Sequence, residues 1–275
     1  MSTLQPQVFA APFDAIAATY DETFTRSGVG CAQRAAVWRE LSKAFKPGDR
    51  VLEIGCGTGV DACYLAERGV DVLAFDPSAQ MIEITSRRVG QKGLQALVNT
   101  RVLSAEEISS LPTTEPFDGV FSNFGALNCV EELAPVARNL ARLLKPGASA
   151  LLCWMGPYCI WEIGRYLSQA NASTAFRRIH REGIRARIGD GAFVHVQYPS
   201  VKFLVRTFAP EFQLKLVRGI GVTVPPSYME PWARRHPQTL RFCDQLDSWL
   251  GRFPGIRMLG DHVLVQLQRD SSSHG

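Results

Sequence analysis

The sequence predicts an α/β fold in which a mostly parallel β-sheet carries helices on both faces. Between residues 50 and 154, short β-branched or apolar runs alternate with stretches of helical periodicity. Neighbouring parallel strands need a crossover, usually a helix, so this alternation is typical of a doubly wound sheet. A glycine-rich turn follows the first of these strands, where such sheets bind ligands. The length of 275 residues fits one domain with an insertion.

Five strands are expected in this core, each a short run of apolar or β-branched residues that ends at a turn. They cover residues 50–54, 70–75, 97–103, 117–122 and 148–154. Three helices are expected between them, over residues 60–68, 78–89 and 131–144. The last of these has apolar residues along one face, which predicts that it packs on the sheet.

The segments that flank the core are predicted to be helices before it and a mixture of elements after it. The helices before it are expected at 14–24 and 31–45. After the fifth strand the alternation of strands and helices breaks down. The arginine-rich stretch 177–187 is expected to be helical, and residues 193–198 are expected to form a strand. The tail is predicted to contain a helix (200–208), a strand (212–217), a proline-rich loop (224–237), a helix (238–250) and a final strand (262–268).

Composition excludes several classes of function. The net charge of +4 is too small to require a nucleic acid or an anionic membrane as partner. The seven cysteines contain no CxxC pair, which predicts reduced thiols without a disulfide framework or a zinc site. The first basic residue is Arg26, unlike the charged start of a signal peptide, and the most apolar run is too short to span a bilayer. We therefore expect a cytoplasmic protein with no nucleic-acid or membrane partner.

The segment VLEIGCGTG, residues 51–59, carries the most functional information. Its three glycines let the backbone pass directly under a ligand, because side chains there would collide with it. Glu53 stands near the end of the preceding strand. Asp76 lies seventeen residues past the last glycine, at the end of the second strand, where a carboxylate can bind two ribose hydroxyls. The pattern predicts a site for a nucleoside-containing cofactor.

Two kinds of cofactor compete for this pattern. A dinucleotide fingerprint GxGxxA can be fitted to residues 57–62, but it leaves Glu53 unexplained, since a carboxylate beside a pyrophosphate would repel it. A cationic sulfonium or an α-amino group would instead be attracted by Glu53. The residues therefore favour S-adenosylmethionine over a nicotinamide or flavin dinucleotide.

On these motifs the sequence resembles the class I S-adenosylmethionine-dependent methyltransferases that act on small molecules. The likeness covers residues 13–154 and the final HVLVQLQ strand, and its other segments are FDPSAQMIE, LSAEEISSLP, FDGVFSNFGALN, LLKPGASALL and FDAIAATYDETF. It implies a Rossmann-like seven-stranded sheet whose last strand is antiparallel. It also implies that N-terminal helices (1–48) cover the cofactor, that the core (49–155) binds it, that a substrate cap (156–199) follows the fifth strand, and that residues 200–275 complete the sheet.

The resemblance also assigns cofactor-binding residues. The glycines would pass under the methionine and ribose, Glu53 would support the amino-acid end, and Asp76 would hold the ribose hydroxyls. Tyr20 would close the site, and Asn123 would lie near the transferred methyl group. The complete expected set is Tyr20, Glu53, Gly55, Gly57, Gly59, Asp76, Pro77, Met81, Ala105, Glu106 and Asn123.

Two differences from the motifs of related methyltransferases narrow the range of acceptors and metal requirements that the sequence predicts. The fourth strand ends in SNFG, residues 122–125, and not in the (N/D)PP(Y/F) tetrapeptide of enzymes that methylate nucleobase amines. This position also lacks the acid with which catechol-type enzymes bind magnesium. The sequence therefore predicts a metal-independent enzyme, with no metal ligands, that acts on a small-molecule acceptor.

Two side chains are candidates for catalysis on the acceptor. His195 lies in FVHVQY, where alternation places residues 193, 195 and 197 on one face of a strand and residues 194, 196 and 198 on the other. A neutral histidine can take a proton near pH 7, although a structural surface histidine is the competing interpretation. Tyr158 follows the fifth strand directly, where it either lines the acceptor pocket or packs the insertion on the core.

These observations predict transfer of a methyl group to an oxygen or nitrogen atom of a metabolite, such as an intermediate of natural-product biosynthesis. Alternatives are C-methylation of an electron-rich ring or enol, and an S-adenosylmethionine-binding module without turnover. A dinucleotide oxidoreductase is a minor further alternative. No heptad or long apolar face predicts an oligomeric state.

Overall fold

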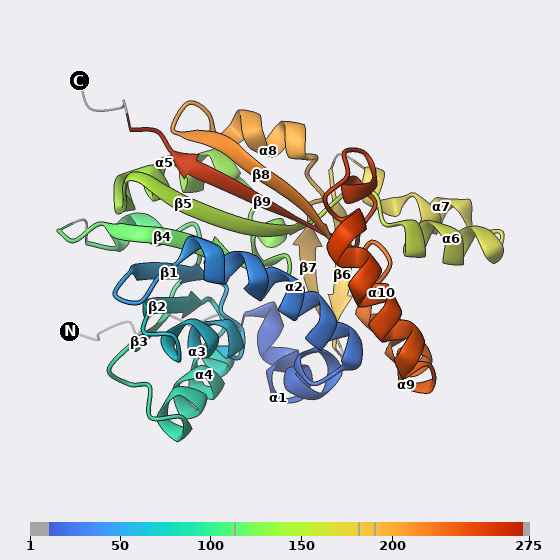
Figure 1. Cartoon of the computed structure of the whole chain (residues 1–275), viewed down its shortest axis with the longest axis horizontal. Coiled ribbons are helices and arrows are strands. Elements are labelled where there is room, and N and C mark those ends of the chain that lie inside the picture. The colour runs from blue at the N-terminus through green and yellow to red at the C-terminus, as the bar shows by residue number, and fades with distance from the viewer. Residues whose placement is uncertain (1–10, 113, 181, 190, 272–275) are drawn as a thin grey trace, which may run out of the picture.

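The computed structural model describes residues 11–112, 114–180, 182–189 and 191–271, and it contains a seven-stranded sheet between two layers of helices (Figure 1). The strand order is β3-β2-β1-β4-β5-β9-β8. The strands span β1 Arg50–Ile54, β2 Asp71–Asp76, β3 Val98–Val102, β4 Phe117–Ser122, β5 Leu144–Met155, β8 Phe212–Ile220 and β9 His262–Arg269. Strands β1 to β5 are parallel, and β9 is antiparallel to both of its neighbours. The predicted α/β sheet with an antiparallel last strand is confirmed.

Helices cover both faces of this sheet, each through an apolar side. One face carries α2 (Gly28–Ala44), α3 (Val60–Ala66) and α4 (Ala79–Gln91), and the other carries α5 (Leu133–Leu143) and α8 (Val201–Phe208). Serine side chains cap several helix starts: the hydroxyl oxygens of Ser27, Ser78 and Ser200 accept from the backbone N–H three residues later in α2, α4 and α8.

The N-terminal segment is helical over residues 14–24, as expected, but it is divided into three short helical pieces of 3-10, α and π type, which we call the N-terminal turns. It contains η1 (Pro12–Ile16), α1 (Ala17–Tyr20) and η2 (Asp21–Thr25). Among the residues that the structure describes, no helix has both the length and the hydropathy needed to cross a bilayer.

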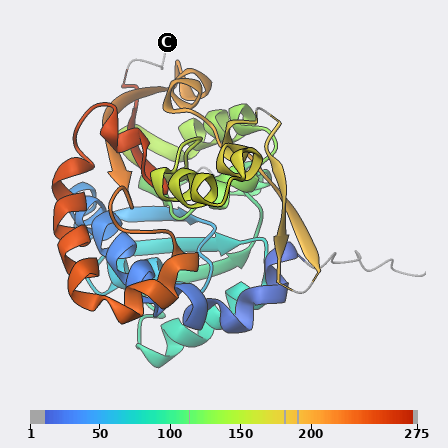
Figure 2. The same ribbon diagram turned by 90° about the vertical axis from the view of Figure 1, so that its right-hand side faces the viewer.

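The insertion after β5 contains α6 (Ile160–Ser168), α7 (Ala172–Ala175), η5 (Arg177–Ile179), β6 (Ile184–Ile188) and β7 (Ala192–Val196). The helix expected over 177–187 is wrong beyond η5, because IRARI alternates apolar and charged residues with the period of a strand. Strands β6 and β7 form an antiparallel hairpin apart from the main sheet. The hairpin reaches the N-terminal turns and contacts η1 (Figure 2).

The C-terminal section places two further helices beside α2. The loop expected over 224–237 instead contains η6 (Ser227–Met229) and α9 (Glu230–Arg235), followed by α10 (Pro237–Leu250). The Glu230 carboxylate accepts from the backbone N–H groups of Gly28 and Val29 at 2.9 and 3.0 Å, so α9 caps the start of α2. The remaining short turns are η3 (Ile108–Ser110), η4 (Ala126–Cys129) and η7 (Ile256–Met258).

Candidate active site

A cavity of about 510 Å³ lies at the edge of the sheet where β1, β2 and β4 end. It has two halves, which we call the loop half and the cap half. The lining of the loop half includes Tyr20, Gly55, Gly57, Asp76, Pro77, Met81 and Asn123. The lining of the cap half includes Glu162, Arg177, Arg178, Ala186, Ile188, Val194, Val196, Tyr198, Tyr228, Asp261 and His262.

The glycine turn needs its glycines for two different reasons. Gly55, Gly57 and Gly59 all have positive φ, at 69°, 53° and 74°. A Cβ on Gly55 would lie 2.2 Å from the Cβ of Ala126, and one on Gly59 would lie 2.4 Å from Thr85, so both positions are closed by packing. Of the residues that the structure describes, only the ring of Tyr20 would come within 4.0 Å of a Cβ on Gly57. Gly57 is therefore the glycine that leaves open space on the cavity side.

Asp76 is tied to this turn through one carboxylate oxygen and to the start of α4 through the other. Oδ2 accepts from the Gly57 N–H and Oδ1 from the Ser78 N–H, each at 2.9 Å. Burial raises the pKa of Asp76, and these two hydrogen bonds offset only part of that rise. Met81 is buried on the following helix and lines the loop half together with Pro77.

Glu53 lies behind the turn, and sequence reasoning missed the charged groups around it. Its side chain is buried, and Oε2 has no hydrogen-bond partner in the described part of the chain. Burial holds the pKa of Glu53 well above its ordinary value, Asp61 adds to this shift, and Arg34 opposes it. Arg34 donates to Asp61 at 2.6 Å, and the Asn123 amide donates to the same carboxylate at 2.8 Å. Each of these two charged residues had a signal that could have revealed it. Asp61 is in the first turn of α3, directly after the glycine turn, and Arg34 is on a buried side of α2.

The N-terminal turns lie over the glycine turn and are anchored to it by Asp21. The Thr58 hydroxyl donates to Asp21 at 2.7 Å, and Arg88 on α4 forms an ion pair with the same carboxylate. Tyr20 precedes this anchor and faces Gly57 across the cavity. Burial raises the pKa of Tyr20 to about 12, which keeps the phenol neutral at physiological pH.

Several sequence-predicted residues do not line the cavity. Ala105 is buried in the core, and Glu106 is exposed on the following turn. Tyr158 is 42% exposed in the segment that leads out of β5, and the cavity lining does not include it. His195 is exposed on the outer face of β7, because its neighbours Val194 and Val196 point into the cavity and side chains alternate along a strand. The structure therefore places neither expected catalytic residue in this cavity.

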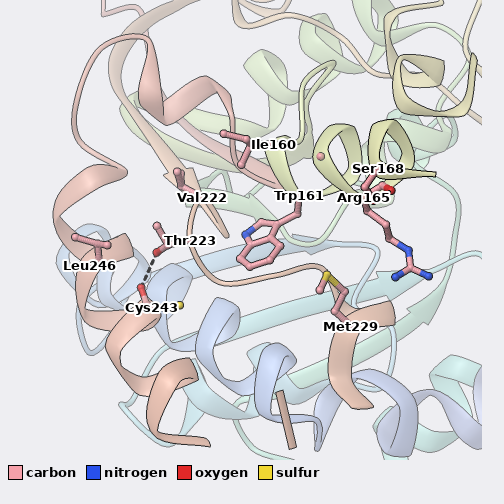
Figure 3. A pocket seen from close by; sticks show the side chains of 10 residues that line it. Ile160, Trp161, Arg165, Ser168, Val222, Thr223, Met229, Cys243 and Leu246 are labelled. Carbon is pink, nitrogen blue, oxygen red and sulfur yellow. Dashed lines mark hydrogen bonds between the residues drawn. The ribbon is translucent and has the colours of Figure 1, made fainter. Parts of the chain in front are cut away.

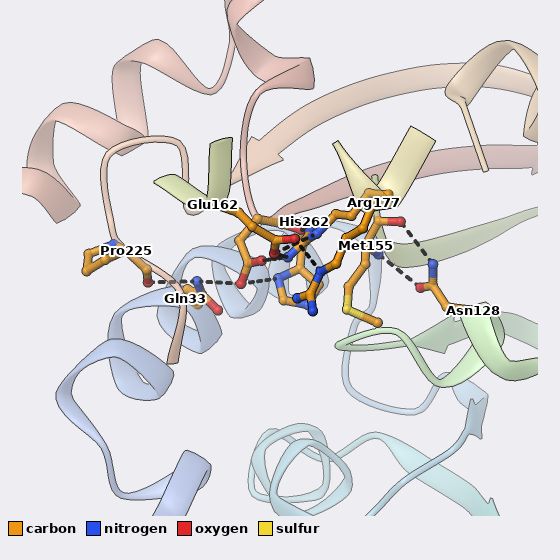
Figure 4. Close-up of polar contacts among 9 residues, drawn as sticks. Gln33, Asn128, Met155, Glu162, Arg177, Pro225 and His262 are labelled. Carbon is orange, nitrogen blue, oxygen red and sulfur yellow. Dashed lines mark hydrogen bonds and ion pairs between the residues drawn. The ribbon is translucent and has the colours of Figure 1, made fainter. Parts of the chain in front are cut away.

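A buried polar cluster closes the cap half, and sequence analysis did not anticipate it (Figure 4). Glu162 of α6 accepts from Arg177 at 2.6 Å and pairs with Arg178 at 2.9 Å. Arg178 also pairs with Asp261 at 2.9 Å, directly before β9. Burial alone would raise the pKa of Asp261, but the imidazole of His262, when it is protonated, and the guanidinium of Arg178 outweigh burial and hold that pKa below its ordinary value.

A second cavity, of about 700 Å³, lies between α6 and the C-terminal helices (Figure 3). Its lining is mostly apolar and includes Ile160, Trp161, Gly164, Arg165, Ser168, Val222, Thr223, Met229, Cys243 and Leu246. Trp161 and Met229 line this cavity, while their sequence neighbours Glu162 and Tyr228 line the first. The two cavities are therefore adjacent at these positions.

Comparison with known proteins identifies relatives of the core. A family model described as a methyltransferase domain matches residues 51–147. A demethylmenaquinone methyltransferase of Clavibacter sepedonicus is 33% identical over 54% of this chain, and the alignment spans 58% of that protein's length. A 2-phytyl-1,4-naphthoquinone methyltransferase of Synechococcus elongatus is 32% identical over 58% of this chain and 68% of its own. The structure of the CcbJ methyltransferase from Streptomyces caelestis superposes with a TM-score of 0.60 at 16% identity, covering 95% of this chain and 98% of that one.

The loop half fits S-adenosylmethionine, the cofactor that the sequence motifs predict. Gly57 leaves room for a ligand directly above the backbone, and Asp76 presents a carboxylate at the tip of β2, where a ribose can bind. Glu53 Oε2 and Asn123 Oδ1 are buried acceptors without partners among the described residues, and an ammonium or sulfonium group suits both. The chain belongs to the class I S-adenosylmethionine-dependent methyltransferases.

Proposed function

We propose that this protein transfers a methyl group from S-adenosylmethionine to a small, largely apolar molecule that carries an oxygen or nitrogen nucleophile. The observation that carries this proposal is the continuity of one cavity from the glycine turn to the cap half. A direct displacement requires the acceptor atom to meet the methyl group in line with the sulfur. A cavity shared by cofactor and acceptor provides the space for that alignment.

The residues of the chain position the reactants and exclude water. When bound, the cofactor supplies an electrophilic methyl group. Asp76 would hold its ribose, Glu53 would attract its positively charged end, and Tyr20 would cover it. Phe124 has a φ of 51°, a left-handed conformation that is uncommon outside glycine, and its ring meets those of Phe24 and His262 at the cavity wall. We propose that Asn123 and Phe124 border the point of transfer.

The cap half favours an acceptor with an apolar body. The inner face of the hairpin presents Ala186, Ile188, Val194 and Val196, while Tyr198 and Tyr228 add aromatic surface. The charged groups of this half are paired with one another. We therefore propose that residues 156–199 act as the acceptor cap and that transfer needs no metal ion.

Methylation of a ring carbon is a second candidate. The relatives are named after quinone acceptors, and the aromatic and aliphatic walls of the cap half suit a planar ring. A ring that carries an ionised hydroxyl can react at oxygen or at the neighbouring carbon. For an aromatic hydroxyl compound as acceptor, the two candidates therefore differ only in the atom that reacts.

The test begins with calorimetric titration of S-adenosylmethionine, S-adenosylhomocysteine and NADH. Micromolar binding of both adenosyl ligands, lost in Asp76→Ala, is expected, and binding of NADH alone would contradict the proposal. The protein is then incubated with methyl-deuterated cofactor, with and without EDTA, and with phenols, amines and 1,4-naphthalenediol kept reduced. Mass spectra of the products distinguish O-, N- and C-methylation. Cofactor binding without transfer to any acceptor would favour the non-catalytic module.

A further inference from the structure

We propose that His262 takes the proton from an aromatic or enolic hydroxyl of the acceptor, an inference that rests on the proposed methyl transfer. His262 is the first residue of β9, where it pairs with Met155 at the end of β5 and with Ile220 at the end of β8. Because β9 is antiparallel to β5, its first residue lies at the edge where the parallel strands end. This edge is the one on which the cavity opens, and His262 lines that cavity.

The contacts of the His262 ring place it beside the expected point of transfer. Its imidazole meets the Phe124 ring edge to face, with 5.5 Å between the ring centroids. Phe124 directly follows Asn123 at the tip of β4, and both line the cavity. An acceptor held under the hairpin, with its reacting ring directed at Asn123 and Phe124, would therefore bring its hydroxyl close to His262.

The surroundings of His262 keep it neutral and ready to accept a proton. Nδ1 is buried, has no hydrogen-bond partner among the described residues, and lies 3.5 Å from the Asp261 carboxylate. That carboxylate accepts from Gln33 of α2 at 3.4 Å. Within the described residues no hydrogen bond occupies Nε2. Burial lowers the pKa of His262 below its ordinary value, Arg178 of η5 lowers it further, and Asp261 opposes both. The other charged groups of the cluster, Glu162 and Arg177, are paired with each other.

This arrangement defines the proton transfer. The hydroxyl proton passes to Nε2, and the electron pair of the broken O–H bond stays on the acceptor oxygen. That oxygen, or the ring carbon conjugated with it, forms the new bond to the methyl carbon, while the carbon–sulfur bond breaks with its electron pair going to sulfur. The resulting imidazolium lies beside the Asp261 carboxylate, which forms an ion pair with Arg178. This step consumes no oxidant, reductant or metal ion.

The first test uses the wild-type protein and does not depend on turnover. Protein with ¹⁵N-labelled histidine is saturated with S-adenosylhomocysteine and titrated with 4-nitrophenol, a hydroxyl compound that serves as the probe. The His262 ring nitrogens should report a neutral imidazole at pH 7 and should shift when the probe binds. An unchanged His262 signal while the probe binds, or absence of probe binding, would overturn the inference. Failure of S-adenosylhomocysteine to bind would instead contradict the proposed function itself.

The second test compares His262→Gln with His180→Gln, a matched change at an exposed histidine of the cap. His262→Gln should bind S-adenosylhomocysteine as the wild type does, which shows that it is folded. Transfer to 1,4-naphthalenediol should fall on the order of 10²- to 10⁴-fold in kcat, the usual contribution of a general base. His180→Gln should keep the wild-type rate.

The pH profile distinguishes proton acceptance from packing. Because the pKa of His262 is lowered, the wild-type rate should persist at neutral pH and decline only as the pH falls through that lowered value. In His262→Gln this acidic decline should vanish. A retained decline in His262→Gln, or its disappearance in His195→Gln, would assign the proton transfer to another group.

Discussion

At the scale of single residues, Asp76 couples the shape of the glycine turn to the binding of the cofactor. Its two oxygens accept from Gly57 and Ser78, and only an ionised carboxylate can do this while also accepting from a ribose. Asp76→Asn should therefore lower the affinity for S-adenosylhomocysteine roughly 10- to 100-fold, since a charged hydrogen bond contributes about 1.5–3 kcal/mol. Calorimetry measures the change.

The matched control is Asp71→Asn, which alters the same residue type at the opposite end of β2. Its affinity should equal that of the wild type. Similar losses in both variants would show that the charge of the strand, and not the position of Asp76, determines binding.

The residues that sequence reasoning placed well are those whose neighbours are close in the chain. The loop half was expected from the spacing of Gly55, Gly57 and Asp76, and the structure places all three around the cavity. His262 was not expected, because its place depends on the pairing of β9 with β5, across more than a hundred residues. The antiparallel direction of the last strand was nevertheless a usable signal, since it puts the first residue of that strand at the ligand-binding edge.

At the scale of elements, the N-terminal turns act as a cover that Asp21 holds against the glycine turn. Asp21 accepts from Thr58 and pairs with Arg88, and sequence analysis did not expect this anchor. Asp21→Asn should speed hydrogen exchange over residues 17–25 and weaken S-adenosylhomocysteine binding about fivefold, which corresponds to roughly 1 kcal/mol for a partly exposed pair. Exchange mass spectrometry with and without ligand measures the effect.

Glu22→Gln is the control for this prediction. Glu22 is the next residue, and within the described part of the chain its carboxylate pairs only with the exposed Arg26. Its exchange and affinity should match the wild type. The pKa of Asp21 is lowered because its hydrogen bonds and Arg88 outweigh burial, so the anchor should hold above the ordinary pKa and be lost as the pH falls through the lowered one.

The elements that differ from expectation are those whose local pattern was ambiguous. The arginine-rich stretch was expected to be helical from its composition, but the alternation of IRARI favours a strand that places its apolar side chains in the cavity. The proline-rich loop contains α9 because Pro231 stands at the start of a helix, where its missing N–H costs nothing. Core strands were predicted well because they are short apolar runs bounded by turns, as at β1 and β4.

At the scale of the whole molecule, one buried ionic cluster connects the cap to the sheet and to the N-terminal helices. Arg178 of the cap pairs with Glu162 on α6 and with Asp261 before β9, and Gln33 on α2 donates to Asp261. Residues of the core, the cap and the C-terminal section, which are far apart in the sequence, meet in this cluster. We therefore expect them to unfold together in a single transition.

The last prediction tests this connection with Arg178→Met. Removing the guanidinium leaves two buried carboxylates without their shared partner, and breaking a buried ion pair in this way costs about 3–5 kcal/mol. The free energy of unfolding in urea at pH 7 should fall by that amount. Arg187→Met, at an exposed arginine of β6 in the same cap, should leave it unchanged, and an equal loss in both variants would contradict a special role for the cluster.

The pH dependence of the free energy of unfolding is a further test of this ionic cluster. The pKa of Asp261 in the folded protein lies below its ordinary value of 3.8, so the folded state holds fewer protons than the unfolded chain in this range. Its contribution is present above pH 3.8 and is lost as the pH falls through the lowered value. In Arg178→Met the Asp261 carboxylate keeps the lowering effect of protonated His262 but loses that of the guanidinium, so this decline in stability should become smaller. An undiminished acid decline in the variant would mean that other carboxylates cause it, and that the cluster connects the cap to the sheet by packing more than by charge.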